Sequence, residues 1–337
     1  MTGTPIPGTD APASGFDASS DDSPRFDVLT LGETMAAFRA AAPLRLGGTL
    51  SLSVAGAESN VAIGLARLGH RVRWIGVTGA DEPGELIRRT LRAEGVDLGL
   101  ARIDPDAPTG LILFEARVGD ISRVSYYRTG SAGSRLSPQD VSPAFADAAS
   151  TPRILHVTGI TAGLGTQPYA AVVAAVDAAR AAGATVCLDV NHRQRVWSVE
   201  SAAAALRPLL PSIDLLVASD DELGVLTDDP DPVAALLAAG VPEVVVKHGG
   251  RGATSHGGRD SVHAPARTVP VVDTVGAGDA FVAGLLSGLL DGLDVAGRLD
   301  RAVTTGAFAV ATRGDWEGLP TRTELSLLDH APGSAVR

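Results

Sequence analysis

Residues 269–290 read VPVVDTVGAGDAFVAGLLSGLL, and this stretch guides the interpretation of the whole chain. A short apolar run leads into the Gly276–Gly278 segment, where a helix of small and apolar residues is predicted to begin. Small residues let backbone N–H groups converge at the positive end of that helix, which makes an anion site suited to phosphate oxygens. Asp279 lies in the first turn, where its carboxylate can accept a proton from a hydroxyl group that attacks phosphate. The alternative is a simple turn in which Asp279 caps the helix.

The composition describes a folded, acidic chain. It has 337 residues, 45% of them hydrophobic and 20% charged, which is enough for one large α/β domain or two modest ones. The 28 Lys and Arg residues and 39 Asp and Glu residues give a formal net charge of −11. This charge argues against a general attraction to nucleic acid or to an anionic membrane surface.

Cysteine usage and the chain ends bear on the compartment. Cys187 is the only cysteine, so neither an intramolecular disulfide nor a cysteine-based metal cluster can form. No run of about 18 apolar residues is present, and residues 1–24 lack the basic and apolar regions of a secretory signal. Residues 1–24 are predicted to form a disordered tail, and residues 331–337 a C-terminal tail. We expect a cytoplasmic protein with one folded domain over residues 25–330.

Apolar runs that alternate with helical segments indicate the fold class. From residue 153 onward this alternation is regular, and runs such as 244–246 (VVV) are typical of a parallel sheet covered on both faces. The sequence predicts an α/β fold with a doubly wound, mainly parallel sheet flanked by helices. One strand is predicted over residues 71–79. Two β-rich inserts, at about 36–55 and 108–129, are predicted to pair as a small lid sheet over the carboxyl ends of the strands, where open α/β folds bind ligands. The second insert is predicted to turn at Gly119 and Asp120.

The motif that opens the C-terminal helix resembles the signature of a known family. Residues 273–281 (DTVGAGDAF) are similar to the C-terminal signature of the PfkB, or ribokinase-like, carbohydrate kinases. The resemblance implies a ribokinase-like fold, with Asp279 as the catalytic base and the backbone of Gly276, Ala277 and Gly278 as the anion hole. It also implies ATP as the phosphoryl donor and Mg²⁺ as the cofactor.

A second motif lies near the N-terminus. Residues 55–62 (AGAESNVA) are similar to the family's substrate motif, although Ala55 stands where the family often has glycine. Gly56 permits close approach of a sugar to the backbone, and Asn60 offers a donor and an acceptor to hydroxyl groups. Alone, these residues would indicate a turn and a helix start. The resemblance implies that the substrate-binding residues here are Gly56, Ala57, Glu58 and Asn60.

Two further segments indicate a nucleotide site. Residues 247–252 (KHGGRG) resemble the family's K-x-G-x-x-G segment, with a glycine-rich hairpin turn as the alternative. Residues 219–222 (SDDE) occupy the place of the family's N-x-x-E motif, so Glu222 would bind Mg²⁺ through water, while Ser219 either contributes there or caps a helix. The residues assigned to nucleotide binding are Asn191, Arg193, Ser219, Lys247, Gly249, Gly252, Gly276, Ala277 and Gly278.

Three segments resemble one branch of the family, the 2-keto-3-deoxygluconate kinases. They are residues 126–132 (YYRTGSA), 189–197 (DVNHRQRVW) and 314–322 (GDWEGLPTR), and the Gly32-Glu33 pair near the first strand belongs to the same pattern. The resemblance implies a sugar acid as the substrate.

Arginine side chains in these segments suit an anionic substrate, because a guanidinium group matches a carboxylate in a two-point fork. The resemblance implies that Arg193 holds the substrate carboxylate and that Tyr126 and Arg128 reach in from the lid. It also makes Asp315 a partner for substrate hydroxyl groups. Alternatively, Arg128 is a solvated edge-strand charge and Arg193 pairs with Asp189.

The expected reaction is ATP-dependent phosphorylation of 2-dehydro-3-deoxy-D-gluconate at its 6-hydroxyl group. The alternatives are another kinase of the family, acting as a fructokinase, ribokinase or 5-dehydro-2-deoxygluconokinase, and a sugar or nucleotide sensor without catalysis. Because both expected ligands are anions, Arg128, Arg193 and the Gly276–Gly278 amides are predicted to form a local positive pocket. The exposed lid sheet is predicted to pair with a second copy in a homo-oligomer.

Overall fold

The computed structural model describes residues 26–118, 121–147, 150–257 and 260–330. The tails predicted at 1–24 and 331–337, and a turn predicted at Gly119 and Asp120, lie outside the described residues.

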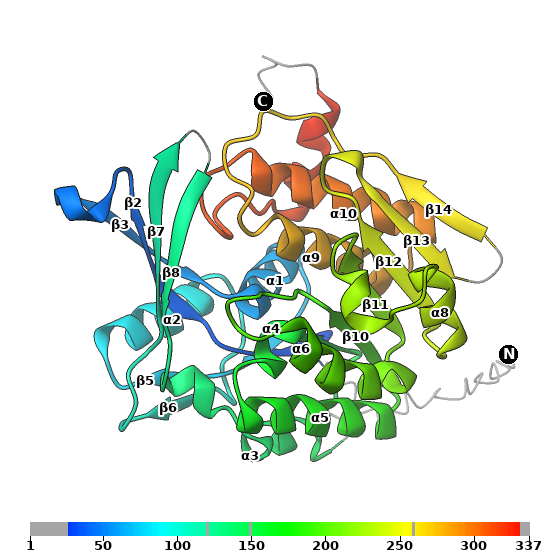
Figure 1. Cartoon of the computed structure of the whole chain (residues 1–337), viewed down its shortest axis with the longest axis horizontal. Coiled ribbons are helices and arrows are strands. Elements are labelled where there is room, and N and C mark those ends of the chain that lie inside the picture. The colour runs from blue at the N-terminus through cyan, green and yellow to red at the C-terminus, as the bar shows by residue number, and fades with distance from the viewer. Residues whose placement is uncertain (1–25, 119–120, 148–149, 258–259, 331–337) are drawn as a thin grey trace, which may run out of the picture.

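The central sheet has eight strands in the order β14-β13-β12-β11-β10-β9-β1-β4 (Figure 1). Their bounds are β4 (Val72–Ile75), β1 (Val28–Leu31), β9 (Ile154–Thr158), β10 (Thr185–Asp189), β11 (Leu215–Ser219), β12 (Glu243–Lys247), β13 (Ala253–Gly257) and β14 (Asp260–Ala264). The strands from β4 to β12 are parallel, and β13 is antiparallel to both of its neighbours. The predicted mainly parallel sheet is therefore confirmed. The sequence did not reveal β13 and β14, because this short, polar hairpin lacks the apolar runs of the inner strands.

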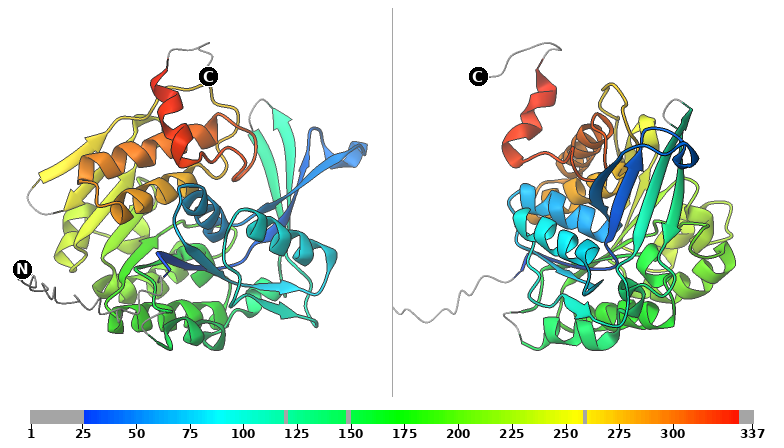
Figure 2. Two further views of the ribbon diagram at one scale, coloured as in Figure 1. Left: turned by 180° about the vertical axis from the view of Figure 1, so that it is seen from behind. Right: turned by 90° about the vertical axis from the view of Figure 1, so that its left-hand side faces the viewer.

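Helices cover both faces of this sheet (Figures 1 and 2). In β12, Val244 and Val246 pack in one core and Val245 in the other, which explains why the strand is apolar throughout. The first core is closed by α5 (Thr166–Ala181), α6 (Val199–Leu206), α7 (Leu223–Leu226) and α8 (Pro232–Ala238). The second core is closed by α1 (Ala57–Arg67), α9 (Ala277–Leu290) and α10 (Val295–Val310).

The prediction of one strand over residues 71–79 is wrong. The chain leaves the central sheet at Gly76, and β5 (Val77–Gly79) pairs instead with β6 (Arg102–Asp104) in a separate two-stranded sheet. A Cβ atom on Gly76 would lie 2.0 Å from the ring of Trp74, so only glycine fits where the two strands part. The close packing of Gly76 against Trp74 thus divides the predicted strand into β4 and β5. The alternation of apolar residues along a strand gives no sign of such a contact.

The lid is a four-stranded sheet in the order β3-β2-β7-β8, which stands apart from the body at the left of Figure 1. Its strands are β2 (Met35–Ala40), β3 (Leu50–Ala55), β7 (Leu111–Val118) and β8 (Ile121–Tyr127). Two antiparallel hairpins are joined through a parallel pairing of β2 with β7. The two β-rich inserts therefore form one small sheet, as predicted.

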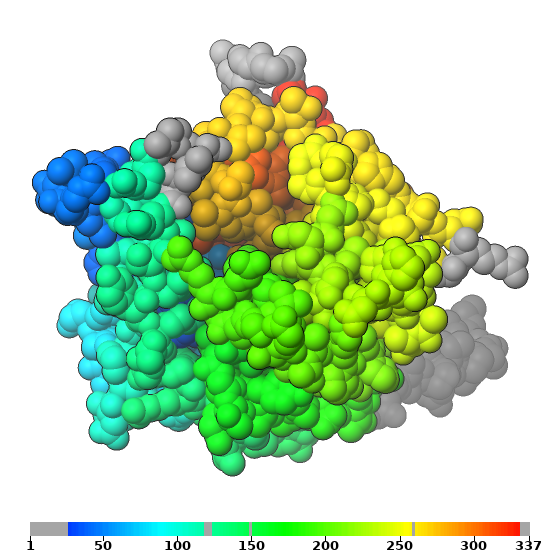
Figure 3. Space-filling model, viewed as in Figure 1, coloured from blue at the N-terminus to red at the C-terminus, as the bar shows by residue number. Residues whose placement is uncertain are grey.

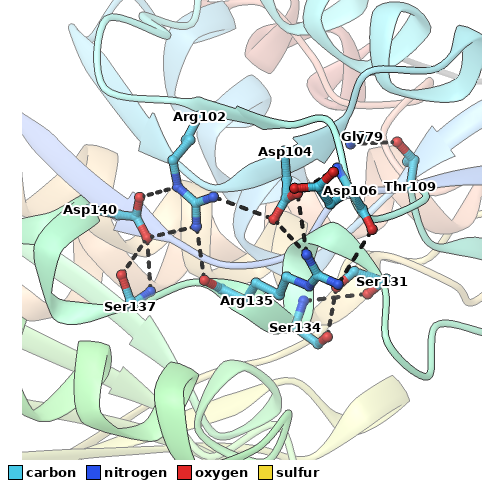
Figure 4. Close-up of polar contacts among 10 residues, drawn as sticks. All are labelled: Gly79, Arg102, Asp104, Asp106, Thr109, Ser131, Ser134, Arg135, Ser137 and Asp140. Atoms are coloured by element: carbon cyan, nitrogen blue, oxygen red, sulfur yellow. Dashed lines mark hydrogen bonds and ion pairs between the residues drawn. The ribbon is translucent and has the colours of Figure 1, made fainter.

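An ion-pair network fastens the second hairpin of the lid to the body (Figure 4). Asp104, at the end of β6, lies between Arg102 and Arg135, at 3.5 Å and 3.2 Å from their guanidinium groups. Arg102 also donates to Asp140 at 2.6 Å. Because Asp104 precedes the hairpin and Arg135 follows it, the network ties the two stems of the lid together.

The remaining helices connect these layers. They are α2 (Glu82–Ala93), α3 (Pro138–Val141), α4 (Gly159–Ala162) and the 3-10 helices η1 (Leu44–Leu46), η2 (Ala132–Arg135), η3 (Ser142–Phe145), η4 (Arg207–Ser212), η5 (Gly249–Arg251) and η6 (Arg322–Asp329). None of the helices among the described residues has the length and apolar character needed to cross a bilayer.

Candidate active site

A cavity of about 860 Å³ lies between the lid sheet and the carboxyl ends of the parallel strands. Figure 3 shows the surface hollowed between the lid strands at the left and the body, with the α9 region at the back of the hollow. All but one of the predicted site residues line this cavity, although they come from segments spread over most of the chain. They are Gly56, Ala57, Asn60, Tyr126, Arg128, Asn191, Arg193, Ser219, Glu222, Lys247, Gly249, Gly252, Gly276, Ala277, Gly278, Asp279 and Asp315.

Glu58 is the exception, because it does not line the cavity. Its buried carboxyl group accepts hydrogen bonds from the hydroxyl groups of Thr158 and Thr161, each at 2.5 Å. A Cβ atom on Gly32 would lie 2.3 Å from the carboxyl carbon of Glu58, so the missing side chain at Gly32 leaves room for Glu58. Burial raises the pKa of Glu58, while the two hydroxyl donors oppose that effect. We therefore assign Glu58 to the framework that joins α1 to β9 and α4, not to substrate contact.

Gly276 sets the geometry at the start of α9. It is the N-cap residue and has φ +75°, in the left-handed region that favours glycine. A Cβ atom there would lie 2.0 Å from the backbone oxygen of Asp315. The helix N-terminus is therefore shaped by backbone packed against backbone. Gly276, Ala277 and Gly278 line the cavity, and N–H groups at a helix N-terminus are suited to bind an anion.

Asp279 lies in the first turn of α9 and faces the same cavity. Asn60 Nδ2 donates to Asp279 Oδ2 at 2.7 Å, and Asn191 Nδ2 lies 3.5 Å from Oδ1. Burial raises the pKa of Asp279 to about 7, and the nearby Asp189 charge adds to this, whereas the Asn60 hydrogen bond opposes it. A carboxyl group with this pKa exchanges a proton readily near neutral pH.

Lys247, the last residue of β12, lies beside the N-terminus of α9. Its Nζ donates to Asp189 Oδ1 at 2.9 Å, and a Cβ atom on Gly278 would lie 3.7 Å from Nζ. Burial by itself lowers the pKa of Lys247, but the carboxylates of Asp189 and Glu222 raise it above its ordinary value. The ammonium group is therefore charged and lies next to the anion site.

The glycine-rich segment after Lys247 forms the hairpin turn that was its alternative interpretation, while its role in nucleotide binding stays a prediction. Residues 248–252 connect the antiparallel strands β12 and β13, with Lys247 opposite Ala253, so the segment is a hairpin loop. Gly249 and Gly252 of the same loop also line the cavity.

Glu222 is held by backbone donors. Its Oε1 accepts the N–H of His192 at 2.9 Å and its Oε2 accepts the N–H of Ser219 at 2.8 Å. Ser219 does not cap α7, because Glu222 occupies that position. Among the described residues, no three His, Cys, Asp or Glu side chains are grouped as ligands for a metal ion. Because each oxygen of Glu222 accepts only one backbone N–H, the carboxylate can also accept water ligands of Mg²⁺, which usually keeps several waters in protein sites.

At the lid end of the cavity, Arg128 is paired with Glu33, a residue that the sequence pattern included without a role. Arg128 Nε donates to Glu33 Oε2 at 2.7 Å, and Nη2 lies 2.5 Å from the same oxygen. The hydroxyl group of Ser131 donates to Glu33 Oε1. Arg128 is mostly buried, so the alternative of a solvated edge-strand charge is wrong.

Arg193 is the least constrained arginine of the predicted set. Its side chain is 49% exposed, donates to the backbone oxygen of His192 at 3.0 Å, and lies 3.7 Å from Glu222. The alternative in which Arg193 pairs with Asp189 is wrong, because Lys247 occupies that carboxylate.

The predicted local positive pocket is not what the side chains form. Arg128 stands against Glu33, Lys247 against Asp189, and Arg193 near Glu222. Buried charges are stable only when paired, so each cation that faces the cavity brings a carboxylate with it. The unpaired positive character therefore comes from backbone amides at the start of α9, and not from an excess of arginine.

Sequence reasoning missed the apolar end of the cavity. This end is lined by apolar residues of α9, α10 and the segment before Asp273: Val269, Val271, Phe281, Val303, Gly306, Ala307 and Val310. Val271 is 59% exposed, which is unusual for valine next to a buried helix. The available signal was the apolar run before the glycine motif. This run forms no strand in the structure, and its valines Val269 and Val271 line the cavity instead.

Comparison with known proteins bears on identity. The chain matches the model of the pfkB family carbohydrate kinases over residues 25–322. It is 36% identical over 315 residues to the 2-dehydro-3-deoxygluconokinase of Bacillus subtilis (strain 168), spanning 90% of this chain and 95% of that protein. It is 35% identical over 306 residues to the 2-dehydro-3-deoxygluconokinase of Thermoproteus tenax, spanning 88% and 92%. It is also 34% identical over 290 residues to a fructokinase of Klebsiella pneumoniae, spanning 82% and 92%.

Solved structures agree with the family match. A protein from E. coli described as a ribokinase II, in complex with ATP and Mg²⁺, has a TM-score of 0.83 and 26% identity, and the match covers 90% of this chain and 99% of that one. The predicted ribokinase-like fold is thus confirmed. Together with the family match over nearly all described residues, these likenesses show that the chain belongs to the pfkB family of carbohydrate kinases and is an ATP-dependent sugar kinase.

Proposed function

We propose that the protein transfers the γ-phosphoryl group of ATP to the 6-hydroxyl group of 2-dehydro-3-deoxy-D-gluconate, giving ADP and 2-dehydro-3-deoxy-6-phosphogluconate. The observation that carries this proposal is Asp279, which faces the cavity from the first turn of α9, accepts a hydrogen bond from Asn60, and has a pKa of about 7. A general base works best when its pKa is near the working pH. The relatives named 2-dehydro-3-deoxygluconokinase support the choice of sugar.

In the proposed step, Asp279 accepts the proton of the attacking hydroxyl group. The hydroxyl oxygen bonds to the γ-phosphorus while the bond from that phosphorus to the β–γ bridging oxygen breaks, and ADP leaves with the electron pair. The Gly276–Gly278 amides and the Lys247 ammonium group stabilise negative charge on the transferred group. The lid excludes water, which would otherwise compete as the acceptor.

Kinases of this family use ATP and Mg²⁺, and Glu222 is the residue proposed to hold the cation through water. Both oxygens of Glu222 accept one backbone N–H each, which fixes the carboxylate and leaves a lone pair on each oxygen for a water ligand. When bound, Mg²⁺ neutralises charge on the phosphates. The adenosine part of ATP is proposed to lie in the apolar end of the cavity, with Ser219, Gly249 and Gly252 along its edge.

The sugar acid is proposed to lie between Asp279 and the lid. Arg193 is proposed to hold its carboxylate, because its guanidinium group is half exposed and its ion pair with Glu222 is long, at 3.7 Å. Tyr126 and Arg128 contact the sugar from the lid strand β8 and the segment after it, and Asp315 binds a hydroxyl group. Such charge-assisted contacts contribute about 1.5–3 kcal/mol each, enough to separate a sugar acid from a neutral sugar by one to two powers of ten.

The test is an ADP-release assay with the purified full chain, ATP and Mg²⁺ over a panel of sugars. We expect the highest kcat/KM with 2-dehydro-3-deoxy-D-gluconate, followed by its galactose-derived epimer, and at least about tenfold lower values with fructose and ribose. A preference for fructose, the substrate in the name of the Klebsiella relative, would overturn the carboxylate assignment. Thermal stabilisation by these ligands without any turnover would instead favour a sensor.

We also propose that the lid sheet pairs with the lid of a second copy. Leu50 and Leu52 of β3 and Tyr127 of β8 are exposed on it, at 43%, 55% and 62%. Apolar surface of this kind is typical of an interface. Light scattering should report a dimer or larger assembly that Leu52→Glu dissociates, and a monomeric wild-type protein would contradict this.

Use of ATP also favours a cytoplasmic location.

A further inference from the structure

Arg39 links the lid to two segments beside the anion site. It lies on β2, and its side chain is 13% exposed. Its Nη1 donates to Asp273 Oδ2 at 3.2 Å, and its Nη2 donates to Asp315 Oδ2 at 2.5 Å. The guanidinium group also lies 3.9 Å from the ring centroid of Phe114, on β7 of the same lid. A single lid residue therefore holds two carboxylates of the body.

Both of these carboxylates belong to segments that shape the start of α9. Asp273 Oδ1 accepts the N–H of Val275 at 3.2 Å, and Asp273 Oδ2 accepts the N–H of Gly314 at 3.3 Å. The backbone oxygen of Asp315 fills the space beside Gly276 that a Cβ atom would need. The loop before α9 and the loop around Asp315 are thus packed together, and Arg39 is the cation between them.

We propose that Arg39 is a positioning residue that couples the closed lid to the geometry of the Gly276–Gly278 anion site. With the lid closed, the guanidinium group neutralises Asp273 and Asp315 and holds the two loops in register. When the lid moves away, the two carboxylates face each other, with Glu317 nearby, and their repulsion loosens the loop that presents the amides. Phosphate oxygens then meet an ordered anion site only under a closed lid, which limits transfer to water.

The ionisation of Asp315 follows from the same contacts. The charged groups that act on it are Arg39 from the lid, Asp273 from the loop before α9, and Glu317 from its own loop. Burial raises the pKa of Asp315 to about 6, and Arg39 opposes this. Removing Arg39 therefore raises this pKa further. If ionised Asp315 is the active form, acidification lowers kcat/KM. In a variant without Arg39, this fall should begin at a higher pH than in the wild type.

The test compares Arg39→Gln with Arg45→Gln, an exposed arginine on η1 of the same lid. Because the proposal rests on the proposed kinase function, the first readout is independent of substrate: hydrogen exchange of the backbone amides over residues 273–281 in the full-length protein. We expect at least about tenfold faster exchange at Val275 in Arg39→Gln, and no change in Arg45→Gln. Equal exchange in Arg39→Gln and the wild type would overturn the proposal, whatever sugar the enzyme uses.

The second readout is kinetic, with the sugar that the wild type phosphorylates best. Arg39→Gln should lose about 10- to 100-fold in kcat/KM for the sugar, and the acidic limb of its pH profile should move to higher pH. Arg39→Lys should recover part of this loss, because one ammonium group reaches only one carboxylate at a time. In an Asp315→Asn background, Arg39→Gln should add little. Fully additive losses, or an unmoved pH profile, would show that Arg39 is merely structural.

Discussion

The two ends of the cavity are built in different ways. The end at α9 uses backbone: Gly276 at φ +75°, the amides that follow it, and the glycine hairpin after Lys247. The lid end uses a side chain that is already paired, because Arg128 is held by Glu33. Asp279 lies between them. An anion site made of amides needs no counter-ion, whereas a site made of arginine must carry its own carboxylates when it is buried.

The difference implies a division of labour. Backbone amides have a fixed position and bind any phosphate, so they suit the part of the reaction that all substrates share. Paired side chains can exchange a protein carboxylate for a ligand carboxylate, so they suit the choice of sugar. Substitutions at the α9 end should therefore reduce turnover with every sugar, and substitutions at the lid end should change selectivity.

The largest expected effect is at the residue between the two ends. Asp279→Asn should reduce kcat by at least about 10²–10⁴, because the hydroxyl proton loses its acceptor. ATP affinity, measured by calorimetry, should stay within a few-fold of wild type, because the amides remain. A variant with near wild-type kcat would rule out Asp279 as the base.

The same variant gives a pH-dependent readout of stability. The folded pKa of about 7 lies above the ordinary value of 3.8, so the stabilising contribution of the protonated group is lost as pH rises through 7. At pH 8 the buried, ionised carboxylate costs at most about 4 kcal/mol. Asp279→Asn should therefore raise the melting temperature more at pH 8 than at pH 5. The same increment at both pH values would contradict the raised pKa.

Gly276→Ala should give the next largest loss. The new Cβ atom would collide with the Asp315 backbone oxygen and strain a left-handed residue, so we expect about 10²–10³ lower kcat with acidic and neutral sugars alike. Gly224→Ala is the control, because it is exposed on α7 with no atom within 4 Å of its Cβ position. A loss of kcat with only one of the sugars would contradict the proposal that the α9 end serves all substrates alike.

Arg193→Ala tests the side chain that is proposed to hold the substrate carboxylate. We expect about 10- to 100-fold lower kcat/KM for the sugar acid, from loss of charge-assisted hydrogen bonds, and little change for neutral sugars. The assay is steady-state ADP release, with fructose as the internal control. An equal loss for both kinds of sugar would place Arg193 with the phosphates instead.

The smallest expected effect is at Glu33. Glu33→Gln removes the counter-charge that fixes Arg128, so KM for the sugar acid should rise about tenfold while kcat changes less. Glu82→Gln, at an exposed position of α2, is the matched control. A fall in kcat with unchanged KM would mean that Glu33 acts on the chemistry and not on sugar binding.

Sequence reasoning reached the parallel sheet, the two-part lid and the cavity residues, because each rests on a local signal. Val244–Val246 predicts a doubly covered strand from three adjacent residues, and 273–281 contains its turn, helix start and acid within nine. It failed at Gly76, where packing against Trp74 divides a strand, and at Glu58, whose partners lie on β9 and α4. Both failures depend on contacts that local periodicity does not contain.

Local sequence is sufficient to predict the backbone features of this protein: the glycine turn, the helix that follows it, and the apolar runs that form strands of the sheet. The partners in the ion pairs, in contrast, become known only from the folded structure. Lys247 pairs with Asp189, which is 58 residues away in the sequence. Arg128 pairs with Glu33 across 95 residues, and Arg39 pairs with Asp315 across 276 residues. Secondary structure follows from steric limits and side-chain period over a few residues. Ion pairs between distant segments follow from burial, which forces each charge to find a partner once the fold has brought the segments together.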